Sequence, residues 1–243
     1  MIKSVSIILP LYNEEKRLKN TFNKISKFLS NNNIKYKEIV FVDDGSTDDS
    51  SKLITSYIES EKKKKFIKLY LIKYQKNLGK GGALKAGVKK ASGKWILTSD
   101  IDFSVPLNEV LNWDRKGYIT KNSKVYFASR SHTNSTVNSK FYRKAMGSIL
   151  RTLISFLLKI DIQDTQCGYK FYEKSVAKKV FLRMKSLKYE HDIEIILILK
   201  KMRLNIIELP VVWTHVPYSK VNIFSDSLKV LMSIFLLKKK YLK

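Results

Sequence analysis

The stretch WILTSDIDFSVP, from Trp95 to Pro106, places two acidic residues at the end of a strand-like run. Residues 95–98 are apolar or β-branched, which is typical of a buried strand. The run ends at Ser99, and Asp100 and Asp102 follow it. Two neighbouring carboxylates repel each other unless a positive charge lies between them. The stretch therefore raises the question of what supplies that charge in this chain.

Upstream of this stretch, expected strands and helices alternate. Apolar runs predict strands at 5–13, 38–46, 66–74 and 94–100. Apolar residues at helical spacing follow the first two, and Ser46 or Thr47 can cap the second of these helices. A glycine-rich turn at 77–93 opens a third helix. This alternation predicts an α/β fold with a mostly parallel, Rossmann-like sheet and helices on both faces. Residues 1–115 are interpreted as a nucleotide-binding half.

The second half, residues 116–222, is less regular. Strands are expected at 124–130, 165–173 and 205–216, and helices at 141–160, 176–182 and 193–199. An amphipathic basic tail follows at 223–243. No repeat or low-complexity linker separates the halves, so we expect one domain over 1–243 with one continuous sheet.

The composition indicates a folded protein with an excess of positive charge. Lys and Arg number 47 against 21 Asp and Glu, a formal net charge of +26. Such a charge favours anionic partners, although a lysine excess spread along the whole chain also fits a general composition bias. No apolar run reaches the roughly 18 residues of a spanning helix. The single cysteine, Cys167, excludes an internal disulfide and fits a reducing cytoplasm.

Unusual segments recur at the carboxyl ends of the expected strands. They are Pro10–Glu14, Asp43–Ser46, Asn77–Gly81 and Asp100–Asp102. Each alone could be a helix cap, a plain turn or a chance occurrence. The glycine segment also lacks the pattern of a P-loop. Ligands of open α/β sheets bind outside the carboxyl ends of strands, so the four segments together indicate a ligand site.

With these motifs the chain resembles the nucleotide-sugar-dependent glycosyltransferases of family 2, which have the GT-A fold. The matching segments are SIILPLYNEE, VFVDDGSTDDS, NLGKGGALKAG and TSDIDF. Three later stretches, at 164–177, 189–201 and 208–222, are similar to the dolichyl-phosphate glucosyltransferase branch and its bacterial polyprenyl-phosphate relatives. The resemblance covers nearly the whole chain.

The resemblance implies a donor site for a UDP-hexose, or alternatively a GDP-hexose. Its implied residues are Pro10, Tyr12, Glu14, Asp43, Asp44, Gly79, Lys80 and Asp100. It also implies that Asp100 and Asp102 hold Mg²⁺ or Mn²⁺, shared with the donor diphosphate, and that Asp102 is catalytic. On this interpretation, the positive charge between the two acids is a metal ion.

The implied acceptor is a polyprenyl phosphate, dolichyl or undecaprenyl. A phosphate monoester is already ionised near pH 7, because its second pKa is about 6, so cations matter more than a general base. We expect Arg130, Arg143 and Lys220 to bind this phosphate, with Arg130 also catalytic; a surface position for either arginine remains an alternative. Asp192 lies where relatives with hydroxyl acceptors keep their base, and we expect it to contact the sugar or the acceptor. Glu194 is interpreted as a helix-face residue.

Three functions are therefore weighed. The leading one is an inverting, metal-dependent transferase that moves a hexose, first of all glucose, to a polyprenyl phosphate. A second uses a glycan or other hydroxyl acceptor in cell-surface polysaccharide synthesis. A third is a basic module that binds nucleic acid or membrane without catalysis. It is disfavoured because the residues that recur in order at the strand ends are acids.

Membrane contact is expected without a spanning helix. The helix 141–160 and the tail 223–237 have apolar faces with basic flanks, a pattern typical of peripheral attachment to an anionic membrane surface, here its cytoplasmic face. Core packing or a dimer face is the alternative for the helix. The sequence makes no prediction of oligomeric state.

Overall fold

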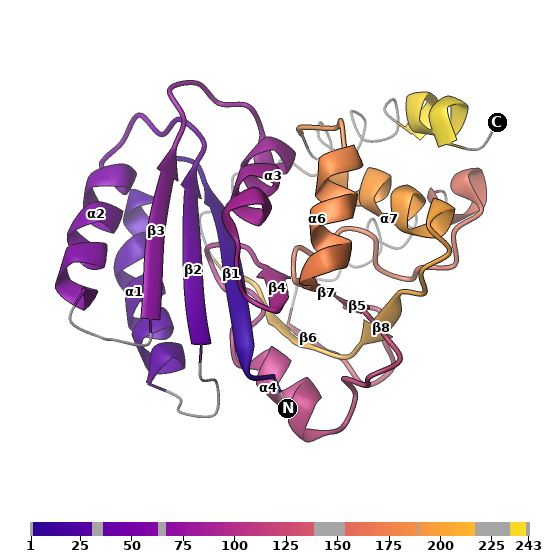
Figure 1. Cartoon of the computed structure of the whole chain (residues 1–243), viewed down its shortest axis with the longest axis horizontal. Coiled ribbons are helices and arrows are strands. Elements are labelled where there is room, and N and C mark those ends of the chain that lie inside the picture. Colours follow the sequence, from indigo (N-terminus) through magenta and orange to yellow (C-terminus); the bar gives the residue numbers. More distant parts are fainter. Residues whose placement is uncertain are drawn as a thin grey trace.

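The computed structural model describes residues 2–30, 36–62, 67–138, 154–188, 190–216 and 234–241 (Figure 1). The first part of the chain forms β1 (Ser4–Leu11), α1 (Glu15–Leu29), β2 (Tyr36–Asp43), α2 (Ser50–Glu61), β3 (Ile67–Lys73), α3 (Lys80–Lys90) and β4 (Trp95–Thr98). The second part forms α4 (Glu109–Arg115), β5 (Val125–Ala128), β6 (Thr136–Asn138), β7 (Lys170–Glu173), α6 (Lys174–Arg183), α7 (His191–Lys201), β8 (Ile207–Leu209) and β9 (Val212–Thr214). Residues 154–158 and 234–241 are also helical.

A seven-stranded sheet contains strands from both halves of the sequence. Its order is β3-β2-β1-β4-β7-β5-β8. The strands β1 to β4 pair in parallel, as do β5 and β8, whereas β7 is antiparallel to both β4 and β5. The expected mostly parallel α/β sheet is therefore confirmed. Because β7 runs in the opposite direction, the residues that precede it lie at the same edge as the carboxyl ends of the other strands.

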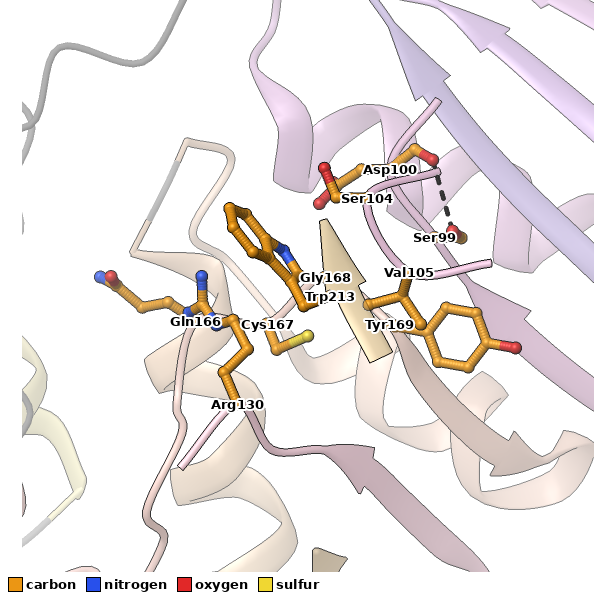
Figure 2. A pocket seen from close by; sticks show the side chains of 10 residues that line it. All are labelled: Ser99, Asp100, Ser104, Val105, Arg130, Gln166, Cys167, Gly168, Tyr169 and Trp213. Carbon is orange, nitrogen blue, oxygen red and sulfur yellow. Dashed lines mark hydrogen bonds between the residues drawn. The ribbon is translucent and has the colours of Figure 1, made fainter. Parts of the chain in front are cut away.

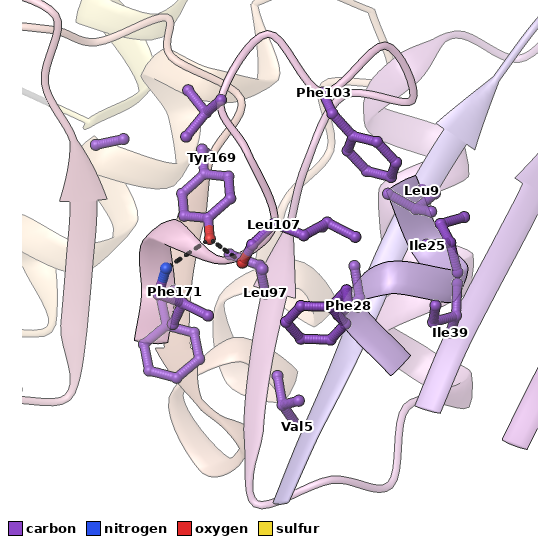
Figure 3. Close-up of a cluster of buried hydrophobic side chains, with 14 of the residues drawn as sticks. Val5, Leu9, Ile25, Phe28, Ile39, Leu97, Phe103, Leu107, Tyr169 and Phe171 are labelled. Carbon is purple, nitrogen blue, oxygen red and sulfur yellow. Dashed lines mark hydrogen bonds between the residues drawn. The ribbon is translucent and has the colours of Figure 1, made fainter. Parts of the chain in front are cut away.

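Helices cover both faces of this sheet, and alternate strand residues point into two cores. In β1, Val5, Ile7 and Leu9 face the core under α1, α2 and α4, whereas Ile8 faces the core under α3, α6 and α7. Figure 3 shows part of the first core, where the buried Tyr169 hydroxyl accepts from the Val110 amide and donates to the Leu107 carbonyl. This contact anchors the start of α4 against the chain that enters β7.

Two local predictions need correction, and two elements were not expected. The single strand expected at 205–216 is two strands in different sheets, because Pro210 has no amide hydrogen with which to continue a ladder; β9 pairs with β6. The helix α2 begins at Ser50, later than the predicted cap at Ser46 or Thr47. Those residues instead bond to Asn13 on the loop after β1. Neither α4 nor β6 was expected from the sequence.

Much of the expected interfacial segments lies outside the described residues, including 141–153 and 223–233. Within the described ranges, no helix combines the length and the apolar character needed to cross a membrane.

Candidate active site

The strand ends and the chain entering β7 enclose a cleft (Figure 2). Its lining residues are Ser99, Asp100, Ser104, Val105, Arg130, Gln166, Cys167, Gly168, Tyr169 and Trp213. They come from the loop after β4, the end of β5, the segment before β7 and the strand β9. Burial raises the pKa of Cys167 to about 12, so its thiol stays protonated and is not a nucleophile.

Asp100 forms an ion pair with a lysine at the start of α3. The Lys80 ammonium lies 2.6 Å from Asp100 Oδ1. Burial acts to raise the pKa of Asp100, but the charge and hydrogen bond of Lys80, together with the charge of Lys170, lower that pKa below its ordinary value. The carboxylate is therefore ionised at neutral pH.

Gly168 leaves the space that the Asp100 carboxylate occupies. A Cβ at position 168 would lie 2.7 Å from both carboxylate oxygens. No larger residue fits there without displacing Asp100. Gly168, in the segment before β7, thus makes room for an acid on the loop after β4.

Asp102 is held by its own turn. Its Oδ1 accepts hydrogen bonds from the Ser104 amide at 2.9 Å and from the Ser104 hydroxyl at 3.0 Å. The Arg17 guanidinium lies 3.8 Å from Asp102 Oδ2 and 3.2 Å from a carboxylate oxygen of Glu14. Each acid of the pair therefore faces a cation of the chain itself: Lys80 for Asp100 and Arg17 for Asp102. Arg17 was not predicted as a site residue, although its place three residues after Glu14 on α1 could have indicated it.

Hydrogen bonds join the loops after β1, β2 and β3 into one rim. Asn13 Oδ1 accepts from the Thr47 amide at 2.7 Å, which links the first two loops. Asp44 accepts from the amides of Leu78 and Gly79, each at 2.8 Å, which links the second and third. Burial raises the pKa of Asp44.

The expected donor residues thus lie at one edge of the sheet, but several of them are buried or bonded to the loops that form this edge. Asp43 is fully buried and accepts from the Ser46 amide at 2.8 Å and from the Ser51 hydroxyl. Pro10 is a buried residue of β1. Tyr12, in contrast, is 39% exposed.

Arg130 is fixed by a buried carboxylate. Its Nε and Nη2 donate to the two oxygens of Asp164 at 2.7 and 2.8 Å, and its amide adds a third bond at 2.9 Å. Asp164 is fully buried, and its own amide donates to Glu208 at 2.9 Å. The bidentate geometry sets the plane of the guanidinium, which lies 6.0 Å from the Trp213 ring in the same cleft as Asp100. Arg143 and Lys220 lie outside the described residues.

The family is shown by comparison with known sequences. The model of "Glycosyl transferase family 2" matches residues 6–181. The chain belongs to this family. It is therefore a nucleotide-sugar-dependent glycosyltransferase, as the motifs predicted.

Several of its relatives have the same activity in their names. The "Dolichyl-phosphate beta-glucosyltransferase" of Dictyostelium discoideum is 32% identical over 98% of this chain and 75% of the relative. Proteins of the same name from Saccharomyces cerevisiae and Homo sapiens are each 27% identical, over 98% and 99% of this chain and 75% and 76% of their own. The expected branch is thus confirmed.

Solved structures of other transferases share the fold of this family 2 chain. Glucosyl-3-phosphoglycerate synthase from Mycobacterium tuberculosis, solved with Mn²⁺, UDP and glucosyl-3-phosphoglycerate, superposes with a TM-score of 0.68 at 16% identity, covering 97% of this chain and 80% of the other. A mannosyltransferase from Pyrobaculum calidifontis with GDP-Man and Mn²⁺ gives 0.62 at 18%, covering 97% and 64%. The GT-A fold is confirmed.

In this glycosyltransferase, Asp192 is buried beside a buried lysine. Its carboxylate pairs with the Lys170 ammonium, and His191 Nε2 lies 3.4 Å from the same oxygen. Burial would raise the pKa of Asp192, but the charges of His191, Lys170 and Lys80 hold it at about 2. Burial also lowers the pKa of His191, so Lys170 is the principal cation at neutral pH. Lys170 was not predicted from the sequence.

The donor chemistry of the two acids fits a divalent cation. Carboxylate oxygens are the ligands that Mg²⁺ and Mn²⁺ prefer, and Gly168 keeps one face of Asp100 free of side-chain carbon. Within the described part of the chain, no group of three or more His, Cys, Asp or Glu side chains could hold a metal ion. A cation at Asp100 and Asp102 would therefore take further ligands from elsewhere, such as a diphosphate.

We expect Gly168→Ala to weaken binding of UDP in the presence of Mn²⁺ by about tenfold, because the new methyl group would displace the Asp100 carboxylate. Calorimetric titration with UDP measures the change. The comparison variant is Ala86→Gly, on α3, which removes one methyl group where Gly168→Ala adds one. We expect it to bind UDP normally. Unchanged UDP affinity in Gly168→Ala would show that the Asp100 position is not needed for the nucleotide.

Proposed function

We propose that this enzyme transfers glucose from UDP-glucose to a polyprenyl phosphate, dolichyl or undecaprenyl, with inversion at the anomeric carbon. The names of its relatives over nearly the whole chain support the acceptor and the sugar. The structural observation that carries the proposal is the cleft itself. Arg130, held rigidly by Asp164, lies in the same cleft as Asp100, so a phosphate-binding group faces the donor end of the site.

For the donor, Asp100 and Asp102 hold Mg²⁺ or Mn²⁺ in this proposal. When bound, that ion stabilises the charge that develops on the leaving diphosphate. Lys80 and Arg17 lie beside the same two acids and supply further positive charge to the diphosphate. The nucleoside lies along the rim, with Tyr12 against the base and Glu14, Asp43, Asp44 and Gly79 shaping the pocket around the base and ribose.

For the acceptor, Arg130 binds the phosphate and aims one of its oxygens at the anomeric carbon. That oxygen forms the new bond to carbon as the bond from carbon to the diphosphate oxygen breaks, and UDP leaves with the electron pair. No proton has to be removed, because the phosphate is ionised near neutral pH. The pKa of about 2 and the ion pair with Lys170 make Asp192 a weak base, which favours a phosphate over a hydroxyl acceptor. We further assign Arg143 and Lys220 to this phosphate.

We propose that the enzyme meets its lipid at the cytoplasmic surface of an anionic membrane. The helical residues 154–158 and 234–241 bury one side and leave Phe156, Phe235 and Leu236 exposed by 80%, 63% and 73%. Lys238–Lys240 follow directly. Exposed apolar side chains beside lysines are the combination that binds an interface with anionic lipids.

A transfer assay tests the proposal. Purified protein is given radiolabelled UDP-glucose, Mn²⁺ and dolichyl or undecaprenyl phosphate in detergent, and label is measured in the organic phase. We expect Arg130→Lys to raise the KM for the lipid phosphate at least tenfold, since lysine cannot reproduce the bidentate bond with Asp164. Arg115→Lys, an exposed arginine on α4, is the matched control and should leave KM unchanged. UDP release with label only in water-soluble products would instead support a hydroxyl acceptor.

A further inference from the structure

Glu194 joins three parts of the chain although it is fully buried. It lies in the first turn of α7 and is 0% exposed. Its Oε2 accepts from the amides of Lys185 and Ser186 at 2.9 and 2.6 Å, and its Oε1 accepts from Lys240 Nζ at 2.5 Å and the Tyr241 hydroxyl at 2.7 Å. A single carboxylate thus bonds the segment between α6 and α7 and the C-terminal helical residues 234–241.

The segment that Glu194 holds packs against the glycine turn Gly79–Gly82, which includes the first residues of α3. The Gly82 amide donates to the Leu187 carbonyl at 3.1 Å. A Cβ at Gly79 would lie 2.5 Å from the Leu187 oxygen, and one at Gly81 would lie 2.7 Å from the Ser186 oxygen. The two backbones therefore touch directly, with no side chain between them to absorb a displacement. Gly79 also has a φ of +99°, a conformation that glycine adopts readily.

This glycine turn carries the groups assigned to the donor. Its Lys80 reaches Asp100, and its Gly79 amide is bonded to Asp44. A shift of the Ser186–Leu187 backbone would therefore move both the lysine beside the metal-binding acid and the rim around the nucleoside.

The partners of Glu194 on the C-terminal side come from a helical segment that packs one face against the second core. Ile234 and Leu237 are buried in the core that also contains α7, whereas Phe235 and Leu236 point to solvent. Lys240 and Tyr241 end this segment over Glu194. Without them, the buried Glu194 carboxylate would lose two of its hydrogen-bond donors, one of them charged, a costly state that favours movement or hydration of the carboxylate.

We propose that Glu194 is a positioning residue through which the C-terminal segment 234–241 sets the affinity of the enzyme for the nucleoside diphosphate. The inference rests on the proposed donor site but not on the nature of the acceptor. The contacts form a continuous chain from Lys240 and Tyr241 through Glu194 and the Ser186–Leu187 backbone to the glycine turn and Lys80. A surface that binds Phe235 and Leu236 would act on the same series of contacts. Binding of the C-terminal segment to such a surface is therefore linked to binding of the donor.

The test uses the double variant Lys240→Met/Tyr241→Phe of the 243-residue chain. Lys240 is exposed, and Tyr241, which packs against the second core, keeps its ring as phenylalanine. We expect UDP, titrated with Mn²⁺ and without lipid, to bind five- to tenfold more weakly. Lys239→Met removes one charge from an exposed position of the same segment and should leave UDP affinity unchanged. Lys240→Arg, which keeps a charged donor, should retain most of the wild-type affinity.

Two further readouts distinguish coupling through Glu194 from partial unfolding and from altered membrane binding. Thermal unfolding midpoints within a few degrees of wild type would show that the double variant is folded, and equal binding of both variants to anionic vesicles would exclude a change in membrane affinity. Equal UDP affinity in the double variant and in Lys239→Met would overturn the inference. Failure of glucose to reach lipid, with UDP affinity still lowered in the double variant, would overturn the proposed function alone. Absence of UDP binding by the wild-type enzyme would overturn both.

Discussion

Replacing Asp102 with alanine is expected to lower the rate of glucose transfer by about 100- to 1,000-fold, the usual loss when a principal electrostatic contact to a leaving group is removed. The change also removes the acceptor of both Ser104 hydrogen bonds, so the thermal unfolding midpoint of the variant is measured beside its rate to show that the fold is kept. Initial rates with saturating donor and acceptor measure the effect. The residual activity should also become insensitive to EDTA, whereas wild-type activity should disappear with it.

The control for Asp102→Ala is Glu59→Ala, which removes one exposed acid from α2. Its rate and its response to EDTA should match those of the wild type. Binding of Mn²⁺ in the presence of UDP, followed by electron paramagnetic resonance, gives a second readout that does not depend on turnover. An Asp102→Ala enzyme that keeps a wild-type rate and binds Mn²⁺ normally would refute the assignment of the metal to this acid.

The second large effect is on stability. Asp192→Ala would leave the Lys170 ammonium buried, 2% exposed, without its carboxylate. Breaking a buried ion pair from one side typically costs about 3–5 kcal/mol. We expect a loss of that size in the free energy of unfolding, measured by denaturant titration. The double variant Lys170→Met/Asp192→Asn removes both charges and should recover most of it. A single variant as stable as wild type would contradict the ion pair.

This coupling changes how the role of Asp192 in catalysis can be tested. Lost activity in Asp192→Ala alone would not distinguish a missing base from a damaged fold, whereas the charge-neutral double variant does. With a phosphate acceptor we expect it to lose less than tenfold in turnover; an enzyme that needs a base would lose nearly all. The folded-state pKa of Asp192, about 2, lies below its unfolded value, so its contribution to stability is present above about pH 4 and is lost as the pH falls toward 2.

The sheet edge at which we propose the donor site could be largely located from the sequence. Parallel strands leave their carboxyl ends at one edge, so the segments after four successive strands had to lie together, and the structure places them there with Lys80 against Asp100. The sequence pattern did not reveal how far Asp43 and Asp44 are used to hold the loops themselves. Hydrogen bonds from backbone amides leave no periodic signal.

The surroundings of Arg130, where we propose that the acceptor binds, were less predictable because their contacts join residues far apart in the chain. Arg130 and Asp164 meet only because β7 pairs antiparallel with β5. No local sequence pattern predicts that pairing. Lys170 was overlooked since a lysine within a short apolar run is usually at a surface. Glu194 could have been recognised: the residues of α7 around it, Ile193 to Leu199, are apolar on every side, and a carboxylate in such a helix needs partners.

The position of β7 also has a consequence for the order in which the chain can fold. Both β4 and β5 pair with β7, and among the described strands β5 has no neighbour but β7 and β8. During synthesis, β1 to β4 can therefore assemble early with the donor loops in place, while one side of β4 stays an open edge until residues 170–173 leave the ribosome. An open, apolar edge strand is prone to pair with other chains. The interval between the synthesis of β4 and that of β7 is therefore the period in which a nascent chain of this enzyme most needs protection from aggregation.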